Sequence, residues 1–206
     1  MTAMHLYLVR HAQSCQNADM TGSWHPDDAP LTEYGKRQAE LLAMRPDLQN
    51  VDAIYASTLL RAAQTAYPLA KRLNKSITLV DDAIERDTAI FGTDRGAMLQ
   101  EVPCAVWREW TPRIVTDAET PEMLRERAKR LIDWITERSD DNGSVLLVTH
   151  CAFFGYPLRY LLHIPNDEPF AWKIDNCAVT HIELRPGDIP LLYCANDRGH
   201  LYAEEM

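Results

Sequence analysis

Residues 8–14 read Leu-Val-Arg-His-Ala-Gln-Ser. Leu8 and Val9 complete an apolar run that starts at Leu6. A continuous apolar run predicts a strand that is buried on both faces, and this strand ends at an arginine followed by an imidazole, His11. A second apolar run, at residues 145–149, ends in the same way at His150. Open α/β sheets bind ligands at the carboxyl ends of their strands, so we predict that the two histidines share one site.

The length and composition of the chain are typical of one globular domain. A chain of 206 residues buries about 70% of its unfolded surface, so we expect a single domain over residues 1–206. No apolar run reaches the roughly 18 residues of a membrane span, and the first residues lack the pattern of a secretory signal. The net charge of −9 argues against nucleic-acid and membrane partners, which need basic surface. The sequence indicates no oligomeric state.

The cysteines and histidines show none of the common metal or disulfide patterns. The five cysteines contain no CxxC pair and leave one unpaired, which favours reduced thiols and a cytoplasmic location. The histidines lack metal-ligand spacing and the sequence has no HExxH motif, so we expect no metal and no other cofactor.

Strand-like and helix-like segments alternate along the chain. Apolar runs predict strands at about residues 4–9, 53–56, 77–80, 145–149, 178–184 and 191–195. Helical periodicity covers about residues 31–44, 58–73 and 121–138. The alternation predicts a three-layer α/β/α sandwich with a mostly parallel central sheet. A short connection between the last two strands predicts an antiparallel C-terminal hairpin. Residues 15–30 and 86–120 show no clean periodicity, and we interpret them as binding loops or lids.

The strand ends carry side chains that suit a bound phosphoryl group. Arg61 lies in the first turn of the helix at 58–73, where free N–H groups and the helix dipole favour an anion. Two arginines would add planar cationic forks that match phosphate oxygens. One neutral histidine could then act as a nucleophile while the other donates to the phosphoryl oxygens. The leaving oxygen also needs a proton donor, expected to be a carboxylic acid on another strand-end loop.

Several ordered segments resemble the histidine phosphatase superfamily, the phosphoglycerate-mutase-like or RHG enzymes, over nearly the whole chain. The matching segments are Arg-His-Ala-Gln-Ser-Cys-Gln-Asn at 10–17, Pro-Leu-Thr-Glu-Tyr-Gly-Lys-Arg-Gln-Ala at 30–39, Ser-Thr-Leu-Leu-Arg-Ala-Ala-Gln-Thr-Ala at 57–66, Val-Thr-His at 148–150 and Asp-Asn-Cys at 175–177. The resemblance implies the phosphoglycerate-mutase-like fold and catalysis through a phosphorylated histidine.

The resemblance also implies roles for individual residues. His11 would be the nucleophile that becomes phosphohistidine. The phosphoryl group would be held by Arg10, Arg61 and His150. Glu85, in the loop after the third strand, would be the general acid and later the general base, with Asp82 and Asp87 as rivals for this role. The residues expected to contact the substrate are Asn17, Ser57 and Thr21, although Asn17 and Ser57 could instead stabilise turns.

The chain departs from the family pattern at three places, which together comprise four residues. Ala12 replaces the usual glycine, which matters if the backbone there needs a positive φ. Gln13 replaces a common glutamate, and Cys151-Ala152 follows the late histidine where the family often has Gly-Gly or Gly-Asn. None of these changes removes a group that the chemistry needs.

The expected activity is that of a phosphatase of the histidine acid phosphatase type, acting on a small-molecule phosphate ester. Two alternatives stay open: a phosphoglycerate mutase that uses a bisphosphorylated primer, and a catalytically weak relative that binds phosphorylated ligands. Mutases carry a Tyr-Gly pair soon after the acid, where this chain has Asp-Thr-Ala at 87–89, whereas Thr21-Gly22 resembles the mutase loop. A mutase must also exclude water from its phosphoenzyme, which needs a closing lid.

Overall fold

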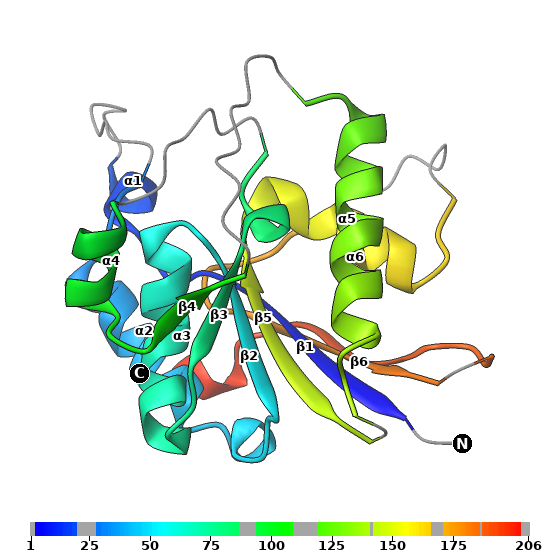
Figure 1. Cartoon of the computed structure of the whole chain (residues 1–206), viewed down its shortest axis with the longest axis horizontal. Helices are drawn as coiled ribbons and strands as arrows, with labels where there is room; N and C mark the ends of the chain where they lie inside the picture. Colours follow the sequence, from blue (N-terminus) through cyan, green and yellow to red (C-terminus); the bar gives the residue numbers. More distant parts are fainter. Residues whose placement is uncertain are drawn as a thin grey trace.

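A computed structural model describes seven stretches of the chain, and they form one sheet with helices on both faces (Figure 1). The described residues are 3–19, 28–86, 94–108, 119–140, 142–165, 171–185 and 187–202. Their strands are β1 (Met4–Arg10), β2 (Ala53–Ser57), β3 (Ile77–Val80), β4 (Ala105–Trp107), β5 (Ser144–Thr149), β6 (Val179–Leu184) and β7 (Leu191–Asp197). In these residues the sheet has the order β4-β3-β2-β5-β1-β6-β7, which confirms the predicted α/β architecture.

The direction of the strands places both predicted histidines at one edge of the sheet. Strands β1 to β5 are parallel, β6 is antiparallel to β1, and β7 is antiparallel to β6. The antiparallel hairpin predicted at the C-terminal end is therefore confirmed. Strands β1 and β5 are neighbours, with Arg10 opposite Thr149. His11 and His150, the next residue of each chain segment, consequently leave the sheet side by side.

The long helices divide between the two faces of the sheet, α2 and α3 on one and α5 and α6 on the other (Figure 1). Their bounds are α2 Glu33–Ala43, α3 Leu60–Leu73, α5 Pro121–Thr136 and α6 Cys151–Leu161. Strand side chains alternate between the faces: Val9 and Val148 pack with α2 and α3, whereas Leu8 and Leu147 pack with α5 and α6. All four are fully buried, as the continuous apolar runs predict.

Local sequence signals explain where these helices begin and end. The Thr32 hydroxyl accepts from the Gly35 backbone N–H at 2.9 Å and caps α2. The Thr120 hydroxyl caps α5 in the same way, with Pro121 in the first helical position. Gly35 lies so close to the loop after β1 that an added Cβ would sit 2.0 Å from the Gln13 carbonyl oxygen. Only glycine fits there, and α2 can therefore pack directly against the segment that carries His11.

Among the described residues, three α-helices, one strand and three short 3₁₀ helices were not predicted. The stretch 86–120, expected to be a connection, contains α4 (Arg95–Glu101) and β4, and the stretch 15–30 contains α1 (Cys15–Ala18). That expectation was wrong at these elements, because segments of three to seven residues are too short to show a period. Helix α6 is apolar on most sides and contains Pro157, so it lacks the amphipathic pattern. Short 3₁₀ helices occur at Pro46–Leu48 (η1), Asp81–Ala83 (η2) and Gly199–Leu201 (η3).

None of the helices in the described residues is long and apolar enough to cross a membrane. The cytoplasmic location stays a prediction.

Candidate active site

The carboxyl edge of the sheet brings together the residues that the strand ends predict. His11 follows β1, His150 follows β5, and Arg61 lies in the first turn of α3 after β2. The three side chains are buried, with 2%, 0% and 3% of their residue surface exposed. The ring centroids of His11 and His150 are 5.0 Å apart. The predicted meeting of the two histidines is therefore confirmed by the geometry.

A backbone contact fixes the tautomer of His11. Its Nδ1 lies 2.7 Å from the Ala12 carbonyl oxygen. Because a carbonyl oxygen only accepts hydrogen bonds, Nδ1 carries the proton and the lone pair resides on Nε2. Burial lowers the pKa of His11 well below 6.5, and the charges of Arg61 and Arg10 lower it further. His11 is consequently a neutral imidazole near pH 7.

His150 is also neutral, for similar reasons. Burial lowers its pKa well below 6.5, and Arg61 and His11 add to the effect. Both ring nitrogens are buried, and neither has a hydrogen-bond partner among the described residues. Buried polar atoms of native proteins almost always have a partner, so an imidazole in this condition suits a ligand-binding role.

Arg10 and the loop after β1 are held by contacts from two other elements. The Arg10 Nη1 atom donates to the Ile174 carbonyl oxygen at 2.7 Å. The Thr65 hydroxyl of α3 donates to the Arg61 carbonyl at 2.7 Å and accepts from the Ala12 N–H at 2.9 Å. Ala12 is not among the described residues with a positive φ. The replacement of the family glycine at this position is therefore compatible with the backbone.

Asn17 belongs to a network of amides beside His11. The Asn176 Nδ2 atom donates at 3.0 Å both to the His11 carbonyl and to Asn17 Oδ1, which also accepts from the Ser14 N–H at 3.2 Å. These bonds orient the Asn17 amide so that its Nδ2 is the atom able to donate to an anion. Asn176 belongs to a segment that matches the family, but the sequence alone predicts no role for it; its position just before a strand is the signal that could have indicated one.

Glu85 binds the N-terminus of α6, the helix whose N-cap residue is His150. Its Oε1 accepts from the backbone N–H of Phe153 at 3.0 Å and of Arg86 at 2.9 Å, and its Oε2 accepts from Ala152 at 3.3 Å. The Thr149 hydroxyl donates to the Ala83 carbonyl at 2.7 Å and ties the end of β5 to the same loop. Of the two oxygens, Oε2 has the longer contact and is better placed to exchange it for a substrate oxygen.

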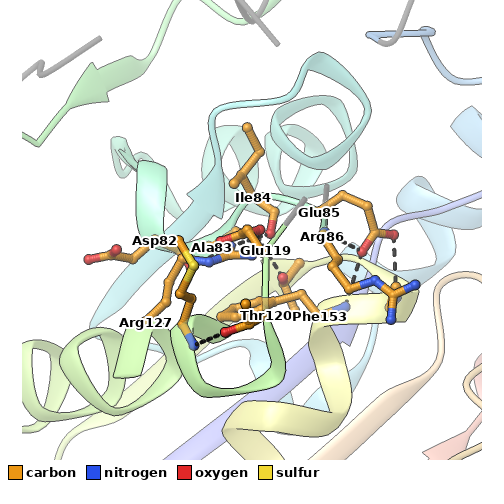
Figure 2. A network of polar contacts seen from close by, with 12 residues as sticks. Asp82, Ala83, Ile84, Glu85, Arg86, Glu119, Thr120, Arg127 and Phe153 are labelled. Carbon is orange, nitrogen blue, oxygen red and sulfur yellow. Dashed lines mark hydrogen bonds and ion pairs between the residues drawn. The ribbon is translucent and has the colours of Figure 1, made fainter. Parts of the chain in front are cut away.

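A buried arginine of α5 supports the Glu85 loop (Figure 2). Arg127 Nη1 donates to the carbonyl oxygens of Ile84 at 2.6 Å and Asp82 at 3.2 Å, and Nη2 donates to Glu119 at 2.7 Å. Its guanidinium carbon lies 3.9 Å from the ring centroid of Phe153, whose N–H binds Glu85. Arg127 therefore contacts both the segment before Glu85 and the helix that binds the carboxylate. It was missed, although an arginine within the apolar stripe of Leu124, Ala128 and Leu131 was a visible signal.

The remaining predicted residues have other positions. Ser57 is buried, and its hydroxyl accepts from the Leu59 N–H at 3.2 Å, which supports the turn-stabilising alternative. The carboxylate of Asp82 pairs with Arg130 at 3.1 Å and Arg108 at 3.6 Å and points away from Glu85 in Figure 2. Thr21 and Asp87 lie outside the described residues. In the part of the chain that the structure describes, no group of three or more histidine, cysteine, aspartate or glutamate side chains could hold a metal.

A mostly parallel sheet with two buried histidines and the buried Arg61 at its carboxyl edge is typical of α/β proteins that hold an oxyanion. The family model of the histidine phosphatase superfamily (branch 1) matches residues 6–197, and the chain belongs to this superfamily. The predicted resemblance is thereby confirmed.

Relatives in the superfamily include phosphatases and mutases. The chain is 30% identical to phosphoserine phosphatase 1 of Hydrogenobacter thermophilus, covering 97% of this chain and 96% of that one. It is 29% identical to the 2,3-bisphosphoglycerate-dependent phosphoglycerate mutase of Thermoplasma acidophilum, over 88% of both chains. The fold matches a phosphoserine phosphatase of Entamoeba histolytica solved in complex with phosphoserine, with a TM-score of 0.69, 23% identity and coverage of 96% and 99%.

Proposed function

We propose that this protein is a phosphatase that hydrolyses small phosphate monoesters in two steps, through a phosphohistidine on His11. The observation that carries the proposal is the state of His11. Its Nδ1 donates to the Ala12 carbonyl, and its lowered pKa keeps Nε2 unprotonated between two arginines. Such a nitrogen is a nucleophile that needs no activating base and no metal ion.

In the first step, Nε2 of His11 attacks the phosphorus atom and the bond to the ester oxygen breaks. Arg10, Arg61 and His150 would hold the phosphoryl group and stabilise its oxygens as charge shifts in the transition state. Glu85, in its protonated form, would give its proton to the leaving oxygen, so that the alcohol departs neutral. The products of this step are phosphohistidine, the alcohol and the Glu85 carboxylate.

In the second step, water takes the place of the alcohol. The Glu85 carboxylate would accept one proton of the water while the oxygen attacks phosphorus and the P–N bond breaks. Inorganic phosphate leaves, His11 regains its lone pair, and Glu85 regains its proton. The position of Glu85 at the N-terminus of α6, the helix that His150 caps, supports one carboxyl group serving both steps.

Phosphatase and mutase activities share the first step and differ in the acceptor of the phosphoryl group. Because the relatives include a phosphoglycerate mutase, mutase activity is the alternative that must be tested. The Asp-Thr-Ala sequence after the acid and Cys151-Ala152 after His150 depart from the mutase pattern, which supports water as the acceptor. That the activity is of the acid phosphatase type stays a prediction, and a measurement of activity against pH would test it.

The test is the release of phosphate from p-nitrophenyl phosphate in the presence of EDTA. We expect turnover by the native protein and a loss of at least about 10³-fold in the His11→Ala variant. An alkali-stable phosphoryl label, trapped by rapid quenching, should form on the native protein and not on His11→Ala. The matched control is His5→Ala, at the opposite end of β1, which should retain activity.

Two results would contradict the proposal. Equal phosphate release by the native protein and His11→Ala would exclude His11 as the nucleophile. Interconversion of 3-phosphoglycerate and 2-phosphoglycerate that outpaces phosphate release would assign the protein to the mutases.

A further inference from the structure

A hollow of about 490 Å³ lies between the beginnings of α5 and α6. The lining side chains that matter here are Arg86, Arg125, Arg159, Tyr156 and Trp172, together with Ala152 of the first turn of α6. This volume lies in the range of small-molecule sites. The hollow is distinct from the pair of buried histidines, which do not line it.

The hollow borders the proposed general acid. Arg86 is the next residue after Glu85, and Ala152 donates its backbone N–H to Glu85 Oε2 at 3.3 Å. Figure 2 shows the side chains of Glu85 and Arg86 next to each other, on the opposite side of the view from Asp82. The acid that protonates the leaving oxygen must face the leaving alcohol. The hollow therefore lies where the carbon part of a substrate would extend.

The charged side chains among the described lining residues of the hollow are all cationic. Three guanidinium groups line it, and none of the described lining residues carries a carboxylate. The chain as a whole has a net charge of −9. The N-terminus of α6, which bears Ala152, adds the positive end of a helix dipole. Cationic side chains gathered at one place on an acidic protein favour an anionic ligand there.

Two of the arginines are anchored by the protein. Arg159 Nη1 donates to the Pro165 carbonyl oxygen at 2.8 Å, a contact that helps to fix the guanidinium group. Arg125 pairs at 2.8 Å with Glu122, whose side chain is 71% exposed, so water screens that pair. Anchored guanidinium groups lose little side-chain entropy when an anion binds.

An aromatic wall completes the hollow. Trp172 packs on α6 where the helix has Gly155: a Cβ added to Gly155 would lie 3.4 Å from Trp172 Cδ1. Tyr156, the next residue of the helix, also lines the space. The rings give the hollow an apolar side beside its cationic groups, which suits a short carbon chain that ends in a charged group.

We propose that this hollow is the subsite for the leaving alcohol, and that the substrate is a small phosphate monoester whose alcohol carries a second oxyanion. Guanidinium forks match carboxylate and phosphate oxygens alike, so the shared chemistry is a planar or tetrahedral oxyanion. This inference rests on the proposed phosphatase function and narrows its substrate class.

The test compares esters that differ only in that second group. The first pair is 3-phosphoglycerate and glycerol 3-phosphate, in which a carboxylate replaces CH₂OH. The second pair is propane-1,3-diol bisphosphate and its monophosphate. We expect the native protein to have a kcat/KM about tenfold or more higher for the charged member of at least one pair, and the favoured pair identifies the oxyanion.

Substitutions in the hollow should remove that preference. We expect Arg159→Met and Arg125→Met each to lower kcat/KM for the charged ester about tenfold while the uncharged ester changes less than about twofold, and Arg159→Lys to keep part of the preference. The control Lys129→Met removes one positive charge from α5 one turn further on, where Lys129 pairs with Asp133, and should keep the preference.

Each outcome separates the two proposals. Equal kcat/KM for both members of both pairs, or an equal loss on both in the arginine variants, would overturn the subsite. If no ester is hydrolysed, the phosphatase proposal fails, and calorimetric binding of the same esters to His11→Ala decides the subsite. Tighter binding of the charged ester that is weakened by Arg159→Met would then support it, and equal binding would overturn it.

Discussion

The chemistry of single residues in this site depends on what surrounds them more than on their identity. An exposed imidazole is half protonated near pH 6.5, and the protonated ring has no free lone pair with which to act as a nucleophile. In this protein burial and two neighbouring arginines shift the balance for His11 toward the neutral ring. The same arginines that would bind the phosphoryl group therefore also prepare the nucleophile, and both effects come from placing the residues at one sheet edge.

The protonation state of His11 gives the first prediction. Burial is the main cause of the lowered pKa of His11, and the charge of Arg61 lowers it further, so Arg61→Met should raise that pKa part of the way toward 6.5. ¹⁵N NMR of imidazole-labelled protein should show a neutral Nδ1–H tautomer at pH 6 in the native protein, with His11→Ala identifying the signal. A native His11 that titrates near 6.5, or a pKa unchanged by Arg61→Met, would contradict the burial and charge argument.

Residue-level prediction from sequence succeeded where a residue directly follows a buried strand. His11 and His150 were placed correctly because the apolar runs before them leave no choice of where the chain emerges. Arg127 and Asn176 were not assigned roles, since each acts through contacts to distant backbone that no local pattern records. Ser57 was expected either at the substrate or in a turn, and its hydroxyl accepts from the Leu59 N–H within the turn before α3.

At the scale of elements, α5 and α6 form the part of the site that the spacing of apolar residues in the sequence does not predict. Helix α6 starts at the site with Cys151, and its first N–H groups bind Glu85. Helix α5 contributes Arg127, whose contacts hold the preceding loop against α6 (Figure 2). The strands were predictable because burial on both faces gives continuous apolar runs, whereas α6, short α4 and three-residue β4 carry no clear period.

The second prediction concerns this contact between elements. Arg127→Met breaks a fully buried ion pair with Glu119, and we expect a loss of about 3–5 kcal/mol in the free energy of unfolding. Because Glu85 would lose its positioning, kcat should also fall more for an alkyl phosphate than for 2,4-dinitrophenyl phosphate, whose leaving group needs no proton. Urea unfolding and the two rates measure these effects.

The control for that prediction is Arg130→Met on the same helix. Arg130 pairs with the Asp82 side chain at 3.1 Å, and its own side chain is 57% exposed, so the cost should stay below about 1 kcal/mol. Equal losses of rate on both esters in Arg127→Met would mean that Arg127 supports the fold without positioning the acid.

At the scale of the whole molecule, ion pairs join elements that are far apart in the sequence on the side of the sheet that holds α2. Arg45, after α2, donates to Asp47 and, at 2.7 Å, to Asp197 at the end of β7. Its Nη1 also lies 3.2 Å from His200 Nδ1 in η3, which must be unprotonated to accept. This contact joins the C-terminal strand and turn to the helical layer, and it requires His200 to be neutral.

That requirement makes the stability of the molecule depend on pH. Burial and the charge of Arg45 lower the pKa of His200 to about 4, from 6.5 in the unfolded chain. As pH falls below about 6.5, the unfolded chain binds a proton that the folded chain refuses, so this contribution to stability is present above 6.5 and is lost by about pH 4. The free energy of unfolding should therefore fall less steeply between pH 7 and pH 4.5 in His200→Gln, which keeps an acceptor for Arg45 but cannot titrate. Urea unfolding of both proteins across this range measures the two slopes. At pH 7.5 His200 is neutral in the folded and the unfolded chain, so the difference in free energy of unfolding between the two proteins there measures the effect of the substitution on packing alone. Parallel slopes would show that His200 titrates alike in the folded and unfolded chains and that its contact with Arg45 does not restrict its protonation.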